Sequence, residues 1–273
     1  MQKINSFKLA EPFSKGESFE KGFFNLKKTF IHPSSIIGPN VILDENVKIG
    51  PFCTIFGKVK IGSNTRIHGY TIIGAPAQVV GMEHNHGHIE IGKNCELREF
   101  IAVHSSRYEN GKTTIGDNCY IMNYCHIAHD VTLENNVTLI NNVSLGGHVY
   151  IEHHAFIMAN AMAHQFCKIG AYASLAPLTG IRQDIPPFGM FDKQPGKFVG
   201  LNKVAMKRSG FTSENINNLN SVAKLFYQEK LPYEKIKEIA QTEPWGKDKS
   251  VKYFLQFIEN SKRGVSRKSI LDK

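Results

Sequence analysis

The stretch NYCHIAHDVTL, residues 123–133, carries two histidines three positions apart, and an aspartate directly follows the second. Histidine titrates near neutral pH and can take a proton from a hydroxyl group, and a neighbouring carboxylate can fix its tautomer and raise its basicity. The same residue types bind metal ions, and a single histidine in an apolar run is more often structural. Spacing within the motif does not decide among these readings, because the answer depends on which distant residues lie beside it.

The elements that must position this motif follow a period of six residues. Aliphatic residues recur at every sixth position over residues 31–73, 91–103 and 115–181, and Asn85 and Glu109 interrupt the phase in polar stretches that we expect to be loops. A hexapeptide period is typical of a parallel β-helix. In that fold each hexapeptide forms one side, three sides close a coil, and the aliphatic anchors stack into a continuous core.

The repeat divides the chain into three parts. Residues 31–190 are predicted to form the β-helix, which ends at the proline pair 186–187 because proline cannot donate to a ladder. Residues 191–273 show amphipathic patterns and are predicted to form a helical domain. Residues 1–30 form an N-terminal extension for which the pattern predicts no definite structure.

Cysteine spacing argues against a zinc ribbon or a thiol-redox motif, and the lack of a long apolar run argues against a membrane-spanning protein. The five cysteines form no CxxC pair, and each occupies the small position four residues after an anchor, so we predict a packing role for all of them. The chain has no run of 18 apolar residues and no apolar signal-peptide core, which predicts a cytoplasmic protein without stable membrane insertion. Of the formal charge of +9, the residues from Leu201 onward contribute +7, from 15 basic and 8 acidic side chains. This charge indicates either an acidic partner or a solvated surface.

Coil geometry shows which residues meet the HIAHD motif. Residues 18 apart lie over one another, so His129 stacks under Gly147, and Gly147 stacks under Gln165. Gly147 lacks a side chain, and its N–H could therefore approach a developing oxyanion. The set that stacking brings to one side of three coils is His126, His129, Asp130, Gly147, His148, His164 and Gln165. This convergence favours function over a structural role.

The motifs CHIAHD, SLGGHV, AHQFCKIG, QDIPPF and KRSGF resemble, in this order, those of the bacterial acyl-[acyl-carrier-protein]–UDP-N-acetylglucosamine O-acyltransferases, which begin lipid A synthesis. The resemblance implies a mainly β fold, a left-handed β-helix followed by an α-helical domain. It also implies a homotrimer with sites in clefts between subunits. The implied partners are acyl carrier protein and UDP-N-acetylglucosamine or a related nucleotide sugar, with no nucleic acid, cofactor or metal.

The resemblance also implies residue roles. His129 corresponds to the general base, Asp130 to its partner, and Gly147 to the backbone donor for the oxyanion. The base would take the proton of the sugar 3-hydroxyl, which attacks the thioester of a (3-hydroxy)acyl chain without an acyl-enzyme. The residues that correspond to substrate contacts are His126, His148, His164, Gln165, Gln78, Asn202 and Arg208.

Three departures from the family pattern concern substrate choice. Val79 and Gly81 follow Gln78 where the family has an acidic and a basic residue, and Ser209 replaces the second arginine of KRRGF. These changes leave open a different nucleotide sugar, for example a 3-amino sugar, as the acceptor. Pro177 occupies a position that is glycine in some members, which makes it a candidate ruler of acyl length.

Two other functions fit part of the sequence. The stretch EHNHGH offers His84, His86 and His88 in a predicted loop, and histidine-rich tracts can bind metal, as in a γ-carbonic-anhydrase-like hydratase. A non-catalytic scaffold of stacked coils is the second alternative, but it would leave the histidine cluster unexplained.

Overall fold

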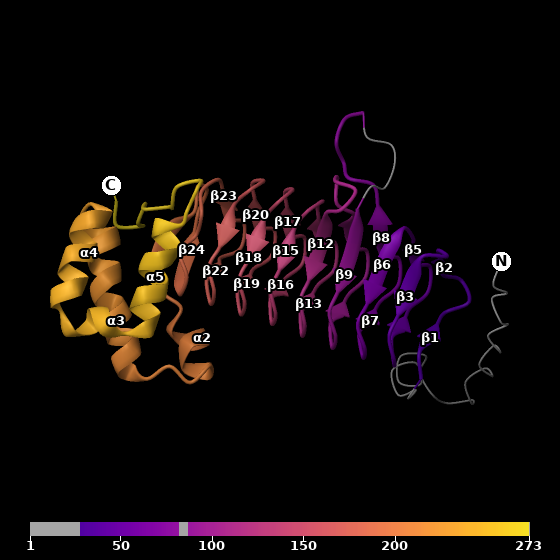
Figure 1. Cartoon of the computed structure of the whole chain (residues 1–273), viewed down its shortest axis with the longest axis horizontal. Helices are drawn as coiled ribbons and strands as arrows, with labels where there is room; N and C mark the ends of the chain where they lie inside the picture. Colours follow the sequence, from indigo (N-terminus) through magenta and orange to yellow (C-terminus); the bar gives the residue numbers. More distant parts are fainter. Residues whose placement is uncertain (1–27, 82–86, 273) are drawn as a thin grey trace.

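A computed structural model describes residues 28–81 and 87–272 and shows a left-handed parallel β-helix followed by a helical domain (Figure 1). The predicted fold class is therefore confirmed. Most of the predicted N-terminal extension, and also Asn85, His84 and His86, lies outside the described residues.

Three sheets form the sides of the β-helix. In spatial order, the first sheet contains β1 (Phe30–Ile31), β4 (Lys48–Ile49), β7 (Arg66–Ile67), β10 (Glu96–Leu97), β13 (Tyr120–Ile121), β16 (Thr138–Leu139), β19 (Phe156–Ile157), β22 (Ser174–Leu175), β24 (Gly189–Asp192) and β25 (Lys197–Leu201). The second contains β2 (Ile36–Ile37), β5 (Thr54–Ile55), β8 (Ile72–Ala75), β11 (Ala102–His104), β14 (His126–Ile127), β17 (Ser144–Leu145), β20 (Met162–Ala163) and β23 (Gly180–Ile181). The third contains β3 (Val41–Leu43), β6 (Lys58–Ile61), β9 (His88–Ile91), β12 (Lys112–Ile115), β15 (Thr132–Leu133), β18 (Tyr150–Ile151) and β21 (Lys168–Ile169).

The strand register confirms the stacking rule where no loop intervenes. Thr132 pairs with Tyr150, 18 residues further on, and Tyr150 pairs with Lys168 after another 18. Between β9 and β12 the spacing rises to 24 residues, because residues 105–111 leave the coil as a loop. The predicted interruption at Glu109 is thus confirmed. The prediction that His88 lies in a loop is wrong, because β9 begins at that residue.

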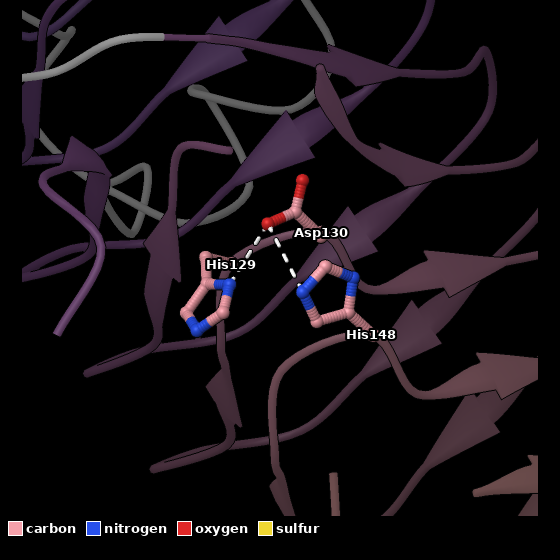
Figure 2. Close-up of side chains that lie close together, drawn as sticks. All are labelled: His129, Asp130 and His148. Carbon is pink, nitrogen blue, oxygen red and sulfur yellow. Dashed lines mark hydrogen bonds and ion pairs between the residues drawn. The ribbon is translucent and has the colours of Figure 1, made fainter. Parts of the chain in front are cut away.

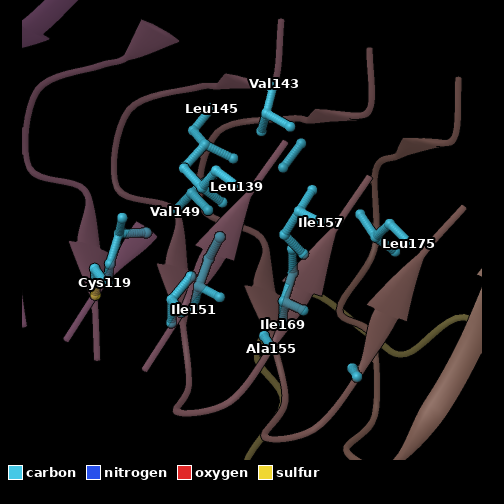
Figure 3. Close-up of a cluster of buried hydrophobic side chains, with 14 of the residues drawn as sticks. Cys119, Leu139, Val143, Leu145, Val149, Ile151, Ala155, Ile157, Ile169 and Leu175 are labelled. Carbon is cyan, nitrogen blue, oxygen red and sulfur yellow. The ribbon is translucent and has the colours of Figure 1, made fainter. Parts of the chain in front are cut away.

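The aliphatic anchors fill the interior, where side chains from all three sheets meet (Figure 3). Leu139, Leu145 and Ile151, one from each side of a single coil, are each fully buried. All five cysteines are also buried, which confirms the packing role predicted for them. The core is continuous along the helix axis, so each coil depends on its neighbours for burial.

Each complete coil turns at three corners, which we name by the sheets they join: the first corner joins sheets one and two, the second joins sheets two and three, and the third joins sheets three and one. A residue with left-handed backbone recurs at these corners, with φ of 64° at Tyr124, 62° at Asp130 and 62° at Asn136. Asparagine and aspartate tolerate this conformation better than most residues. The corner side chains point away from the core and are free to carry other chemistry.

The β-structure continues past the proline pair. Strand β24 runs parallel to β22, and β25 runs antiparallel to β24, so the predicted domain boundary at residue 190 falls inside β24. The segments that follow are α2 (Lys203–Arg208), α3 (Ser213–Ala223), the π-helix η1 (Lys224–Gln228), α4 (Tyr233–Thr242), the 3₁₀-helix η2 (Pro244–Lys247) and α5 (Lys249–Glu259). None of these helices has the length and apolar character needed to cross a membrane.

The helical segment is attached to the coils by buried polar contacts. Glu152 is 5% exposed and accepts hydrogen bonds from Tyr253 of α5 at 2.5 Å and from the N–H of Ala171 at 2.8 Å. Lys168 forms an ion pair with the same carboxylate at 2.7 Å. This fully paired carboxylate fixes α5 against the end of the β-helix.

Candidate active site

The second corner brings the HIAHD motif together with residues from the following coils. His129 and Asp130 follow β14, Gly147 and His148 follow β17, and Gln165 follows β20. Successive strands are parallel and hydrogen-bonded, so these residues stack at one coil per layer, as the sequence predicts. The rigidity of the ladders holds the corner side chains in fixed relative positions.

His129 and Asp130 form a close pair at the centre of this corner. The Nδ1 atom of His129 lies 2.8 Å from Oδ2 of Asp130, and Nε2 of His148 lies 3.7 Å from the same oxygen (Figure 2). The three side chains are 11%, 9% and 21% exposed, respectively. A carboxylate that accepts a hydrogen bond from Nδ1 leaves Nε2 of His129 as the basic nitrogen.

Gly147 packs directly on the His129 ring. A Cβ atom at residue 147 would lie 2.6 Å from Nε2 of His129, so any side chain there would displace the imidazole. Within residues 28–81 and 87–272, the N–H of Gly147 donates to no other group. A backbone donor next to the basic nitrogen suits an oxyanion that forms when a nucleophile deprotonated by His129 attacks a carbonyl.

The neighbouring histidines are held in their neutral form. Burial lowers the pKa of His126, and the adjacent His104 lowers it further. Burial also lowers the pKa of His104 and, against the opposing effect of Asp130, that of His148. Neutral neighbours do not repel the positive charge that His129 acquires as it takes a proton.

Two of these histidines have a ring nitrogen that makes no hydrogen bond within the described residues. The Nε2 atoms of His104 and His148 are buried and lack a hydrogen-bond partner in the described part of the chain. His104 lies 4.9 Å from His126, measured between ring centroids, and its Nδ1 hydrogen-bonds the carbonyl of Pro76 at 2.7 Å. The 18-residue stacking rule does not place His104 beside His126, because the loop of residues 105–111 shifts its coil out of that register.

A cavity of about 690 Å³ opens beside His129 and runs along the second sheet. Five predicted site residues line it, namely Gln78, His129, Gly147, His164 and Gln165. The other lining residues are Ala128, Ser144, Gly146, Met162, Ala163, Gly180, Ile181, Arg182, Gln194 and Pro195. Apolar and small residues therefore share the lining with polar ones, among them His129, Arg182 and Gln194, and such a mixture suits a ligand with an apolar chain and a polar head.

Arg263 in the C-terminal tail contacts two residues that line this cavity. Arg263 donates from Nη2 to Nδ1 of His164 at 2.9 Å and from Nε to the carbonyl of Arg182 at 2.8 Å. Arginine cannot accept a hydrogen bond, so this contact favours the His164 tautomer that carries its proton on Nε2. No periodic signal could have placed Arg263 here, because it lies outside the repeat.

Three other predicted residues lie neither in this cavity nor at the second corner of their own chain. Asn202 is 8% exposed, caps α2, and donates to the carbonyl of Tyr172 at 3.0 Å at the third corner. Arg208 lies in the last turn of α2. Pro177 is exposed at the first corner. Stacking within one chain does not bring these residues to His129.

Among the described residues, His129, Asp130 and His148 also form one group that could hold a metal ion, since their ligand atoms all lie within 4.8 Å of one another. The contact between His129 and Asp130 is already a well-formed hydrogen bond, which accounts for two of these groups without an ion. His88 pairs with Glu90 at 3.6 Å on the third sheet and is not part of this group.

Comparison with known proteins gives one consistent result. A family model described as UDP N-acetylglucosamine O-acyltransferase, domain 2, matches residues 184–266, and a bacterial transferase hexapeptide model matches residues 27–57 and 112–147. A curated relative from Halorhodospira halophila, named acyl-[acyl-carrier-protein]–UDP-N-acetylglucosamine O-acyltransferase, is 35% identical over 88% of this chain and 100% of its own. The relative of the same name from Thermodesulfovibrio yellowstonii is 38% identical over 87% of this chain and 99% of its own.

Solved structures agree with these relatives. The UDP-N-acetylglucosamine acyltransferase of Francisella novicida has a TM-score of 0.77 and 30% identity, and the match covers 86% of this chain and 93% of that one. The enzyme of Bacteroides fragilis has a TM-score of 0.78 and 28% identity, with 87% and 100% covered.

Proposed function

The chain belongs to the family of acyl-[acyl-carrier-protein]–UDP-N-acetylglucosamine O-acyltransferases, and from this premise we propose its reaction and the residues that perform it. It transfers a (3-hydroxy)acyl chain from acyl carrier protein to the 3-hydroxyl of UDP-N-acetylglucosamine, which is the first step of lipid A biosynthesis. The observation that carries this proposal is the His129–Asp130 pair, with Gly147 packed on the His129 ring and a cavity of mixed apolar and polar lining beside it.

In the proposed mechanism His129 acts as the general base. Its Nε2 removes the proton of the sugar 3-hydroxyl as the hydroxyl oxygen attacks the thioester carbonyl, and Asp130 stabilises the imidazolium that forms. The Gly147 N–H hydrogen-bonds the oxyanion of the tetrahedral intermediate. When the intermediate collapses, the C–S bond breaks and the imidazolium returns its proton to the leaving thiolate, so the base is regenerated.

Direct transfer needs no acyl-enzyme, and the thiols support this. Cys125, which precedes the motif, is 1% exposed, and burial raises the pKa of its thiol to about 11. Burial likewise raises the pKa of Cys167 to about 11. A protonated, inward-facing thiol is a poor nucleophile.

The proposed assembly is a homotrimer in which a neighbouring subunit completes each site. Asn202 and Arg208 follow the first sheet and do not line their own chain's cavity, which lies along the second sheet. They can contact nucleotide sugar if the first-sheet side of one subunit packs against the second sheet of the next. The first corner, which joins these two sides, then lies near the threefold axis.

An exposed column of aromatic rings at the first corner supports this arrangement. The rings of Phe52, Tyr70, Phe100 and Tyr124 stack at centroid distances of 5.0 Å, and they remain between 44% and 56% exposed in the single chain. Contiguous exposed apolar surface of this kind is typical of an interface between proteins. We therefore assign this column to the contact between copies of the chain.

The remaining partner is the acidic carrier protein, which we propose docks on the basic C-terminal segment. Residues 201–273 carry the net charge of +7, and Lys207 and Arg208 lie together in the last turn of α2. Added salt should raise the KM for acyl carrier thioester and leave the KM for nucleotide sugar nearly unchanged, because salt screens exposed charges over about 8–10 Å. Equal changes in both constants would contradict specific docking.

The proposed location is the cytoplasm, which cell fractionation would test.

The acceptor is tested directly by acyl transfer with purified protein. A panel of acyl carrier thioesters is combined with UDP-N-acetylglucosamine or with its 3-amino analogue. We expect transfer to the 3-hydroxyl. Preference for the 3-amino sugar would instead support the alternative suggested by Val79, Gly81 and Ser209.

The same assay tests the base. His129→Ala should lower kcat by at least about a hundredfold, the lower range for the loss of a general base, while the trimer and the thermal unfolding midpoint are retained. Near-normal turnover in the folded variant would remove His129 from this role.

A further inference from the structure

The loop of residues 105–111 folds over the second corner next to the His129–Asp130 pair. It arises from six extra residues in one coil, since Ile89 pairs with Thr113, 24 residues away, where the regular coils pair residues 18 apart. Its Ser106 donates from Oγ to Oδ1 of Asp130, and the backbone N–H of Arg107 donates to Oδ2 at 3.3 Å. The insertion therefore contacts the carboxylate that faces the proposed base.

The hydroxyl of Ser106 can donate its hydrogen bond only to Asp130. Ser106 is 1% exposed, and its Oγ accepts a hydrogen bond from the N–H of Tyr108 at 3.0 Å. A hydroxyl has a single proton, so with Tyr108 as donor to its oxygen, that proton is directed to Asp130. A hydrogen bond from a buried hydroxyl to a carboxylate is charge-assisted and stronger than one between neutral groups.

These contacts fix the whole Asp130 side chain. Ser106 occupies Oδ1, while Oδ2 accepts from Nδ1 of His129 at 2.8 Å. The N–H of Asp130 donates to Oγ1 of the fully buried Thr113 at 2.9 Å. Because Ser106 satisfies one oxygen, the other is turned toward the imidazole and holds the proton of His129 on Nδ1.

Two glycines make room for this arrangement. A Cβ atom at Gly111 would lie 2.1 Å from Oγ of Ser106 and 3.2 Å from Oδ1 of Asp130. A Cβ atom at Gly87 would lie 2.5 Å from the Cβ of Ser106. The loop can close on Asp130 only because both positions lack a side chain, which indicates a fitted contact and not a chance approach.

We infer that Ser106 is a positioning residue for acyl transfer, which acts by orienting Asp130 and through it His129. This inference rests on the proposed role of His129 as the base. Ser106 itself touches no reacting atom. Its loss would leave a buried carboxylate oxygen without a donor, and the carboxylate would then turn away from the imidazole to find another partner.

The test is steady-state acyl transfer by Ser106→Ala. We expect kcat to fall about tenfold, and the KM values for both substrates to stay within about twofold, because the contact orients the base and does not bind substrate. Ser269→Ala is the matched control: Ser269 is 3% exposed, accepts the N–H of Leu271 two residues on, and donates to a backbone carbonyl. The control should keep its kcat. An unchanged kcat in folded Ser106→Ala would overturn the inference.

A double-mutant cycle separates positioning from general damage. In an Asp130→Gly background, which avoids backbone strain at φ 62°, Ser106→Ala should cost less than about twofold, since the group it orients is gone. A full tenfold loss in that background would also overturn the inference. Ser106→Cys fills the same space with a weak donor and should lose nearly as much kcat as Ser106→Ala, which covers the case in which the alanine variant does not fold.

Failure of this inference differs from failure of the proposed base. If His129→Ala and Asp130→Gly lose activity while both Ser106 variants keep it, only the role of Ser106 is wrong. If His129→Ala keeps its activity, the proposed base is wrong whatever Ser106 does.

Discussion

Tyr124 and Asp130 lie six residues apart on the same coil, with the same left-handed backbone, yet they belong to regions with different roles. Their φ angles are 64° and 62°. Tyr124 is 56% exposed at the first corner, whereas the Asp130 side chain is 9% exposed at the second. The backbone therefore does not distinguish the two corners, and the difference in function comes from side chains that the repeat leaves free to vary.

Both corners stabilise their columns by stacking. At the first corner the rings of Phe100 and Tyr124 stack at 5.0 Å, and at the second those of His148 and Phe166 stack at 4.6 Å. A left-handed conformation costs a non-glycine residue about 1–2 kcal/mol, and a stacked aromatic pair contributes about 0.5–1.5 kcal/mol. Stacking thus offsets much of the backbone cost at each corner.

The two corners differ in what covers them. At the second, the loop of residues 105–111 contacts Asp130 through the buried Ser106, and Arg263 adds a contact with His164. The aromatic column of the first remains exposed in the single chain. This contrast supports a proposed catalytic corner that is largely assembled within one chain and a first corner whose aromatic column is covered by another copy in the proposed trimer.

The largest expected effect is on catalysis at the second corner. Asp130→Gly removes the carboxylate without backbone strain, because glycine adopts left-handed φ freely, and it should lower kcat by about a hundredfold. Asn136→Gly, at the third corner of the same coil, is the matched control and should leave kcat within about twofold. Both variants are measured in the acyl-transfer assay. A comparable loss of kcat in both would mean that the loss comes from damage to the coil and not from removal of the carboxylate.

A smaller effect is expected on assembly. Phe100→Asp places a charge in the aromatic column. The subunit concentration at which half of the trimer dissociates should rise by at least about tenfold, because burial of a phenylalanine side chain contributes about 1.5–3 kcal/mol. Ile42→Asp, 59% exposed on the third sheet, should leave assembly unchanged. Sedimentation over a range of concentrations measures both variants. If Ile42→Asp dissociated the trimer and Phe100→Asp did not, the interface would lie on the third sheet and not at the first corner.

The smallest effect concerns acyl length and would link the two corners. Pro177 is exposed at the first corner, so it can limit the chain only in the cavity of a neighbouring subunit. Each displaced methylene forfeits about 0.8 kcal/mol, so Pro177→Gly should shift the preference toward a chain two carbons longer by about tenfold. Competition between thioesters that differ by two carbons measures the shift. An unchanged ranking would show that Pro177 is not the ruler.

Most of the site followed from the six-residue period alone. Once the coil length was set at 18 residues, His129, Gly147 and Gln165 had to stack, because parallel ladders pair equivalent residues of successive coils. The burial of Cys125 followed from its place in the same period. In this part of the chain, nearest-neighbour stacking makes tertiary contacts a simple function of sequence separation.

Only the tertiary structure decided which groups complete that corner. Ser106 reaches Asp130 from an insertion that shifts the register to 24 residues, and Arg263 reaches His164 from a tail 99 residues away. The loop and the C-terminal tail have no sequence period, so the spacing of their residues along the chain does not predict which residues they contact. The repeat determined the frame and the position of the proposed base, whereas the contacts proposed to orient it depend on aperiodic segments whose positions are set by packing against the finished coils.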